Sequence, residues 1–161
     1  MKNVAVTILI LMCTNPVQAE DIDQVVVRKG DMRLLLMAGP EVVRNYPISL
    51  GDMPFGHKQR EGDERTPEGQ YLLDYRNPDS DFYKSIHVSY PNAQDQHKAK
   101  IGKHDPGGNI FIHGLPNGFD HIRGYFEGRN WTDGCIAVNN NDHMDEIWAL
   151  VKDGTPIIIL P

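Results

Sequence analysis

The chain has 161 residues, of which 40% are hydrophobic and 24% charged, with 15 Gly and 11 Pro. This length supports one domain with a single core, and the many turn-forming residues favour a β-rich fold. The formal net charge of −6 excludes the basic surface that nucleic-acid binding requires, so we expect no nucleic-acid partner.

Residues 1–19 have the pattern of a cleaved signal peptide. A positively charged start precedes the apolar run Val4–Met12, and Val17–Ala19 resembles a small-residue cleavage site. The apolar run is shorter than the about 20 residues that span a bilayer. We therefore expect an exported protein of the periplasm or cell envelope, with a mature domain at 20–161. Two competing interpretations are that the run is a first core strand and that Cys13 carries a lipid.

Three short strands with turns between them open the mature chain. The apolar runs Gln24–Arg28, Met32–Met37 and Val42–Leu50 have the spacing of an antiparallel meander. The charged side chains of this hairpin are expected to lie in solvent, and we assign no function to them: Arg28, Lys29 and Arg33.

The middle of the chain contains a long loop, two strands and one helix. The loop at 51–65 is rich in glycine and charge, and it leads into Thr66–Gly69, whose Pro and Gly are spaced for a turn. Strands are predicted at Gln70–Asn77 and Phe82–Tyr90. The polar stretch Pro91–Lys103 predicts a short exposed helix.

His97 and His104 lie in or near this helix, seven positions apart. No Cys or further ligand lies in register with them, so solvent-exposed side chains are favoured over a metal site. We expect neither a metal nor a cofactor.

The last third of the chain is predicted to contain three short strands. Asn109–His113 is predicted as a buried strand that ends in a histidine. A long connection, Leu115–Trp131, follows, and its segment Phe119–Glu127 is expected to form a helical turn or a lid. Thr132–Val138 is predicted as a short strand, and Thr155–Leu160 as a buried closing strand.

An amphipathic helix is predicted between the last two strands. Asn141 is its expected N-cap and Asp153–Gly154 its expected end. Apolar residues recur at i, i+3, i+4 and i+7, which places them in the core: Met144, Ile147, Trp148 and Val151.

Cleavage of the leader would leave Cys135 as the single cysteine, so no intramolecular disulfide is expected. An unpaired thiol in an exported protein calls for an explanation. A buried, inert cysteine is one explanation. Gly134 and the polar residues Thr132 and Asp133 beside the thiol favour a reactive cysteine instead, with His113 as its base.

Three motifs in this order resemble the L,D-transpeptidase catalytic domain family, with the YkuD-type fold. They are Thr66–Gly69 (Thr-Pro-Glu-Gly), His113–Gly114 and Thr132–Ile136 (Thr-Asp-Gly-Cys-Ile). The resemblance covers roughly 24–161. It implies a mainly β fold with a few short helices, a β-sandwich-like catalytic domain in the bacterial cell envelope. It also implies action on peptidoglycan stem peptides, with a wall-anchored lipoprotein as a further partner.

The sequence departs from this family in two places. Many members carry Arg or Asn two residues after the cysteine, where this chain has Ala137. The separation of 22 positions between His113 and Cys135 is longer than usual, and the extra length falls in the connection. Arg129 or Arg123 in this connection is therefore a candidate to hold a substrate carboxylate, because Arg offers forked donors. Trp131 is a further candidate for substrate binding.

The chemistry of the two central residues follows from their side chains. A thiol is mostly protonated at neutral pH, so Cys135 needs a base within hydrogen-bond reach to act as the nucleophile. His113 would accept that proton and later donate it to a leaving amine. The resemblance implies that the carbonyl of Gly114 orients the imidazole. The N–H groups of Gly134 and Cys135 are candidates for the oxyanion hole, and Thr132 would support the loop.

The expected reaction is acyl transfer from a stem tetrapeptide, through a thioester on Cys135, to an amine. Water in place of the amine would make the protein an amidase or carboxypeptidase that hydrolyses the stem or releases a wall-linked lipoprotein. Two further classes stay open, a zinc peptidase and a catalytically inactive wall-binding module. The seven His contain no H-E-x-x-H motif, which disfavours the zinc enzyme.

Overall fold

The computed structural model describes residues 21–161. The expected signal peptide, 1–19, therefore lies outside the described residues, as does Cys13. Within the part described, no helix has both the length and the apolar character needed to cross a membrane.

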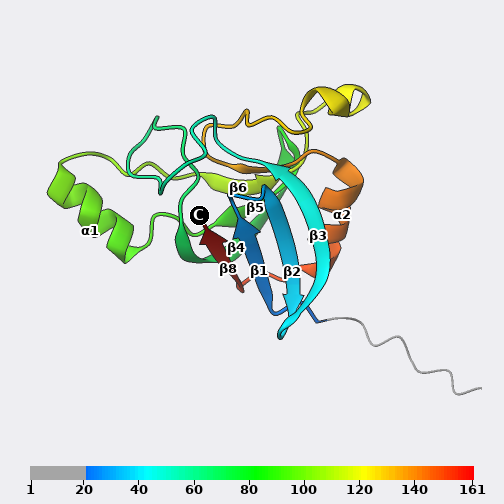
Figure 1. The fold of residues 1–161 in the computed structure, drawn as a ribbon, viewed down its shortest axis with the longest axis horizontal. Helices are drawn as coiled ribbons and strands as arrows, with labels where there is room; N and C mark the ends of the chain where they lie inside the picture. Colours follow the sequence, from blue (N-terminus) through cyan, green and yellow to red (C-terminus); the bar gives the residue numbers. More distant parts are fainter. Residues whose placement is uncertain (1–20) are drawn as a thin grey trace, which may run out of the picture.

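Within residues 21–161, eight strands close into a mixed barrel in the order β1-β2-β3-β7-β6-β5-β4-β8 (Figure 1). The strands are β1 Gln24–Arg28, β2 Arg33–Ala38, β3 Glu41–Ser49, β4 Gly69–Ser80, β5 Tyr83–Val88, β6 Ile110–His113, β7 Ile136–Val138 and β8 Thr155–Leu160. The pairs β1–β8 and β6–β7 are parallel, and the other neighbours are antiparallel.

The expected mainly β class is confirmed, and so is the opening antiparallel meander of β1, β2 and β3. The strands close into a barrel instead of stacking as the two sheets of a sandwich. Closure has a physical benefit, because it leaves no unpaired strand edge.

The barrel interior is filled by alternate residues of each strand, which fixes which residues point outwards. Ile110 and Ile112 of β6 and Ile136 and Val138 of β7 are almost completely buried. Each such side chain contributes about 1.5–3 kcal/mol relative to exposure in water. Because side chains alternate along a strand, the residues between them face away from the core. A slip of one residue would bury these outward residues, so the core holds the register.

Three short helices lie outside the barrel wall in the described chain: α1 Ala93–Gly102, the 3₁₀ helix η1 Asp120–Tyr125 and α2 Asn141–Leu150. The predicted exposed helix is confirmed as α1, which begins at a capping box formed by Asn92 and Asp95. His97 and His104 are exposed, as expected. The helical turn predicted in the long connection is confirmed as η1.

The predicted amphipathic helix is confirmed as α2, with three corrections. Its N-cap is Asn140, whose side chain accepts from the N–H of Asp142; Asn141 is already helical. The helix ends at Leu150, before Asp153–Gly154, because Val151 has extended backbone. Trp148 is only partly buried at the edge of the core, with the guanidinium carbon of Arg76 5.1 Å from its ring.

Lys29 is buried, so the expectation that it lies in solvent is wrong; Arg28 and Arg33 are exposed. Only 2% of the Lys29 side chain is accessible. Its Nζ donates to the carbonyls of Gly56 and Thr66, at 2.6 and 2.9 Å, and to Glu68 at 2.8 Å. One ammonium group thus fastens the 51–65 loop and the turn that follows it to the end of β1.

Candidate active site

The register of β6 and β7 brings His113 and Cys135 to one face of the sheet. His113 pairs with Ala137 on the parallel neighbour strand. Cys135 lies two residues before Ala137 and therefore on the same side of β7. The two candidate side chains are therefore diagonal neighbours across the strand pair. Both line the same cleft.

The turn before β7 is held by the hydroxyl of Thr132. This Oγ1 donates to the carbonyl of Cys135 at 2.8 Å and accepts from the N–H of Gly134 at 3.2 Å. The expected contact of Thr132 with the loop is present. Because the N–H of Gly134 already donates to Thr132, it is a poor candidate for an oxyanion-hole donor. The N–H of Cys135 is then the remaining candidate.

The backbone conformation at Gly134 and the atoms around it leave no place for a side chain. The φ of Gly134 is +129°, a conformation that residues with a Cβ rarely adopt. An added Cβ would lie 2.6 Å from the carbonyl oxygen of Arg65. The 51–65 loop therefore packs directly against the turn that carries the thiol.

His113 is fixed by the carbonyl group next to it in the chain. Its Nδ1 lies 2.7 Å from the oxygen of Gly114, the acceptor that the resemblance implies. A carbonyl only accepts, so Nδ1 carries the proton and Nε2 of the neutral ring is left as a base. Gly114 has no room for a side chain, because a Cβ would lie 2.7 Å from Oδ1 of Asn141 and 3.0 Å from Cβ of Tyr83.

Burial holds both groups in their neutral forms. His113 is 3% exposed, and burial lowers its pKa to about 4 against the opposing hydrogen bond to Gly114. Burial is also the main cause that raises the pKa of the Cys135 thiol, with a smaller contribution from Asp133. The Sγ donates to the carbonyl of Asn109 at 3.5 Å. The resting site thus has a neutral thiol and a neutral imidazole on one cleft, a combination that suits proton transfer during attack.

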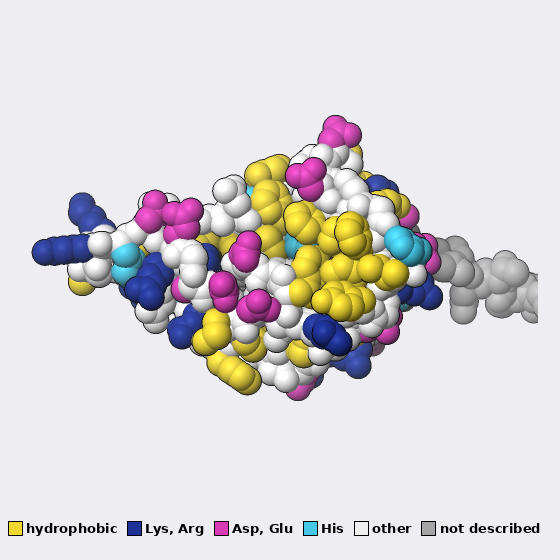
Figure 2. All heavy atoms as spheres, turned by 90° about the horizontal axis from the view of Figure 1, so that it is seen from above, with side chains coloured by type: hydrophobic (Ala, Val, Ile, Leu, Met, Phe, Trp, Pro, Cys, Tyr) yellow, Lys and Arg dark blue, Asp and Glu magenta, His cyan; other side chains and the backbone are white. Residues whose placement is uncertain are grey.

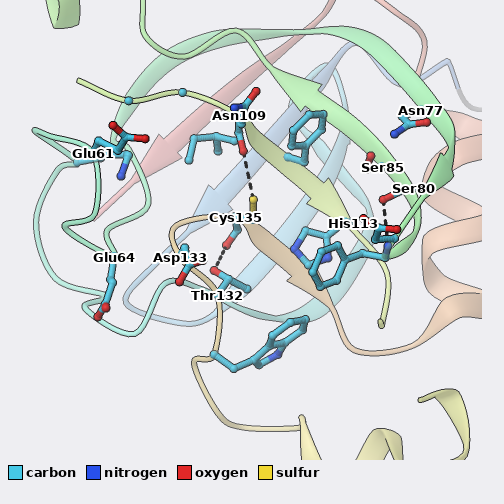
Figure 3. A pocket seen from close by; sticks show the side chains of 18 of the residues that line it. Glu61, Glu64, Asn77, Ser80, Ser85, Asn109, His113, Thr132, Asp133 and Cys135 are labelled. Carbon is cyan, nitrogen blue, oxygen red and sulfur yellow. Dashed lines mark hydrogen bonds between the residues drawn. The ribbon is translucent and has the colours of Figure 1, made fainter. Parts of the chain in front are cut away.

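The cleft has a volume of about 670 Å³ and two chemically different ends (Figure 3). Carboxylates lie on one side of the thiol: Glu61, Glu64 and Asp133. Neutral polar side chains lie on the other side, around the histidine: Asn77, Ser80 and Ser85. Asp81, next to Ser80 in the chain, also lines the cleft. Lys58 also lines the cleft, and its ammonium is paired with Asp63 at 2.8 Å.

Aromatic rings pack against the histidine. The ring centroid of Phe82 lies 4.6 Å from that of His113, and the centroid of Trp131 lies 5.6 Å away. Nε1 of Trp131 donates to Asn139 at 3.2 Å, which fixes the indole. Trp131 lines the cleft, so the structure keeps it as a candidate substrate contact.

The two arginines of the connection, Arg123 and Arg129, are not among the residues that line the cleft, and their role in holding a substrate stays a prediction. Both side chains are exposed, and the guanidinium carbon of Arg129 lies 4.9 Å from the ring centroid of Tyr125. Ala137, where many family members have a polar residue, is fully buried in β7. Figure 2 shows hydrophobic side chains gathered on the upper face beside acidic ones, and the connection adds exposed Phe119 and Tyr125.

Sequence reasoning missed several cleft residues, among them Phe82, Ser85 and Asn109. Ser85 is a polar residue within a predicted strand. Alternation along the strand assigns such a residue to solvent and does not reveal that it faces a cleft. No group of three or more His, Cys, Asp or Glu side chains that could hold a metal ion occurs among the described residues.

A family model for the L,D-transpeptidase catalytic domain, YkuD, matches residues 22–159. The chain belongs to this family. YafK, a candidate L,D-transpeptidase of Escherichia coli (strain K12), is 36% identical over 113 residues, which are 69% of this chain and 38% of YafK. The chain thus spans less than half the length of this L,D-transpeptidase relative.

Solved structures of larger proteins share the L,D-transpeptidase fold. The helical cell shape determining protein Pgp2 from Campylobacter jejuni aligns with a TM-score of 0.62 and 26% identity, covering 86% of this chain and 47% of Pgp2. An L,D-transpeptidase from Mycobacterium smegmatis aligns with a TM-score of 0.56 and 19% identity, covering 88% and 59% of the two chains.

Proposed function

We propose that this protein is a cysteine L,D-transpeptidase that transfers a peptidoglycan stem peptide to an amine. The observation that carries the proposal is the neutral His113 ring, whose Nδ1 is bound to Gly114 while Nε2 shares a cleft with Cys135. This pairing matches what acyl transfer needs, a nucleophile and a base that is free on one nitrogen.

The reaction begins when Nε2 of His113 takes the thiol proton as Sγ of Cys135 attacks a stem carbonyl. That carbonyl belongs to the diamino acid before the terminal D-amino acid. The C–N bond then breaks, the imidazolium gives its proton to the leaving amine, and a thioester remains. A second amine attacks the thioester, loses a proton to Nε2, and the thiol forms again.

The second amine comes from another stem or from a lipoprotein lysine. Carboxylates lie on the far side of the thiol: Glu61, Glu64 and Asp133. They attract a protonated amine, and one of them takes its extra proton so that the free amine can attack, which favours transfer over hydrolysis. The N-terminal pattern at 1–19 supports export to the periplasm or cell envelope, where the catalytic domain, 20–161, would meet this substrate.

The test is product analysis by mass spectrometry. Purified disaccharide tetrapeptide is incubated with the wild type and with Cys135→Ala, with and without an added amine. The proposal requires an exchanged or cross-linked product that forms only with the wild type and needs the acceptor. Release of the D-amino acid without transfer would make the protein a hydrolase. Equal products from both proteins would refute the role of Cys135.

A further inference from the structure

Ser85 is a largely buried residue that lines the cleft, and its hydroxyl has no hydrogen-bond partner among residues 21–161. It is 4% exposed. On β5 the neighbouring Ile86 and Val88 enter the core, so Ser85 faces the other way, into the cleft (Figure 3). Among residues 21–161 the buried polar side-chain atoms without a partner are Tyr46 OH and His143 Nδ1, so the hydroxyl of Ser85 is open to the cleft and free to bond a ligand there.

Strand register aligns Ser85 with the base of the reaction. On one side it pairs with His113 of β6, and on the other with Asn77 of β4. Side chains directly opposite each other on neighbouring strands are about 4.5–5.5 Å apart at Cβ. Asn77, Ser85 and His113 thus form one row across three strands, and all three line the cleft.

The row and its neighbour Ser80 present donors. Oδ1 of Asn77 accepts from the N–H of Asp79 at 3.0 Å, and Oγ of Ser80 accepts from the N–H of Phe82 at 3.1 Å. Their remaining groups, the amide NH₂ and the hydroxyl hydrogen, can only donate. With the hydroxyl of Ser85, this end of the cleft suits an acceptor such as a carboxylate.

We propose that Ser85, with Asn77 and Ser80, binds the carboxylate of the terminal stem residue, the one that leaves. This inference rests on the proposed function. The leaving amine must lie at His113 to receive its proton, and in an α-amino acid the carboxylate is one carbon from that amine. A donor row that begins beside His113 is therefore in the right place.

Asp81 opposes this binding. It lines the cleft next to Ser80, and its exposed carboxylate would repel that of the substrate. The subsite therefore predicts opposite effects at two residues. Ser85→Ala should weaken binding of the stem carboxylate, and Asp81→Asn should strengthen it.

The experiment compares a stem tetrapeptide that has a free terminal carboxylate with the same peptide as its terminal amide. The wild type should prefer the acid. In Ser85→Ala, kcat/KM for the acid should fall about tenfold, as expected for loss of a hydrogen bond to a charged group, and the acid-to-amide ratio should approach one. The melting temperature should not fall, because the hydroxyl has no partner. Ser89→Ala is the matched control, since Ser89 binds the N–H of Leu72 and does not line the cleft.

An unchanged acid-to-amide ratio in Ser85→Ala would overturn the proposal, as would equal losses on both peptides with a lower melting temperature. Calorimetric binding of both peptides to Cys135→Ala, with and without Ser85→Ala, separates this question from turnover. The wild type could show no turnover and still bind the acid more tightly than the amide. If Ser85→Ala removes that binding preference, the subsite stands while the proposed reaction fails. Equal binding of acid and amide to Cys135→Ala refutes the subsite.

Discussion

Nδ1 of His113 and the carbonyl oxygen of Gly114 lie 2.7 Å apart, so the imidazole is oriented by the backbone of the adjacent residue. No carboxylate is involved in this contact. The orientation of the imidazole therefore depends on the position of one carbonyl group. The packing around Gly114 fixes that carbonyl.

Gly114→Ala should reduce both activity and stability. The added Cβ would meet Oδ1 of Asn141 at 2.7 Å and Cβ of Tyr83 at 3.0 Å, so the carbonyl must shift. Overpacking of this kind costs about 1–3 kcal/mol. Urea unfolding and stem turnover measure the two effects. Gly124→Ala is the control, because a Cβ there meets nothing within 4 Å. Equal stability of the two variants would contradict the packing argument.

Alkylation of Cys135 by a small neutral reagent should keep accelerating at alkaline pH. Burial raises the pKa of this thiol, so its thiolate fraction should still grow above the about 8.5 of a free cysteine. The measurement is the second-order rate of iodoacetamide labelling between neutral and alkaline pH. A rate that levels off near neutral pH would indicate a preformed thiolate–imidazolium pair instead.

His113 should make the fold sensitive to acid. Its pKa is about 4 in the fold against 6.5 unfolded, so the unfolded state binds the extra proton first. The stability contributed by the neutral ring is complete above pH 6.5 and is lost as the pH falls towards 4. The loss should be of the order of 3 kcal/mol. The glutamine in His113→Gln does not titrate, so the free energy of unfolding of this variant should fall less than that of the wild type between pH 6.5 and 4. Urea unfolding at each pH gives both curves. Parallel curves for the two proteins would show that His113 does not cause the acid sensitivity.

Lys29→Met should destabilise the protein by about 3–5 kcal/mol, because it leaves Glu68 and two loop carbonyls without their cation. Arg28→Met is the matched control. Arg28 is the preceding residue and pairs with Asp31 at the surface, where an ion pair contributes about 0–1 kcal/mol. Chemical unfolding of both variants gives the comparison. A similar small effect for the two would mean that the buried ammonium does not hold the loop.

Local patterns predicted most of the helices and strands, and the motifs supplied the candidate site residues, which stay predictions. His113 and Cys135 were chosen as candidates from their types and spacing, and the structure places both on one cleft; the Gly114 acceptor came from the family resemblance. Lys29 was missed because its burial depends on a loop about 30 residues later, which folds over the end of β1. The row of Asn77, Ser85 and His113 depends on the register of three strands, and a single sequence gives no register between distant strands.

The position of the arginines of the connection relative to the cleft also depends on the path of the chain. Arg129 is six residues from Cys135 in sequence, but the chain turns at Trp131, whose indole is tied to Asn139. Arg129 then stacks on Tyr125 outside the cleft. Proximity in sequence did not predict the direction of the side chain.

The central claim is tested most directly by the mass of the intact protein after brief mixing with a stem tetrapeptide in the absence of an amine acceptor. We expect a covalent adduct equal to the peptide minus its terminal amino acid, mapped to Cys135 and released by hydroxylamine, with no adduct on Cys135→Ala. An adduct at another residue, or one that also forms on Cys135→Ala, would contradict the assignment of Cys135 as the acyl-carrying nucleophile.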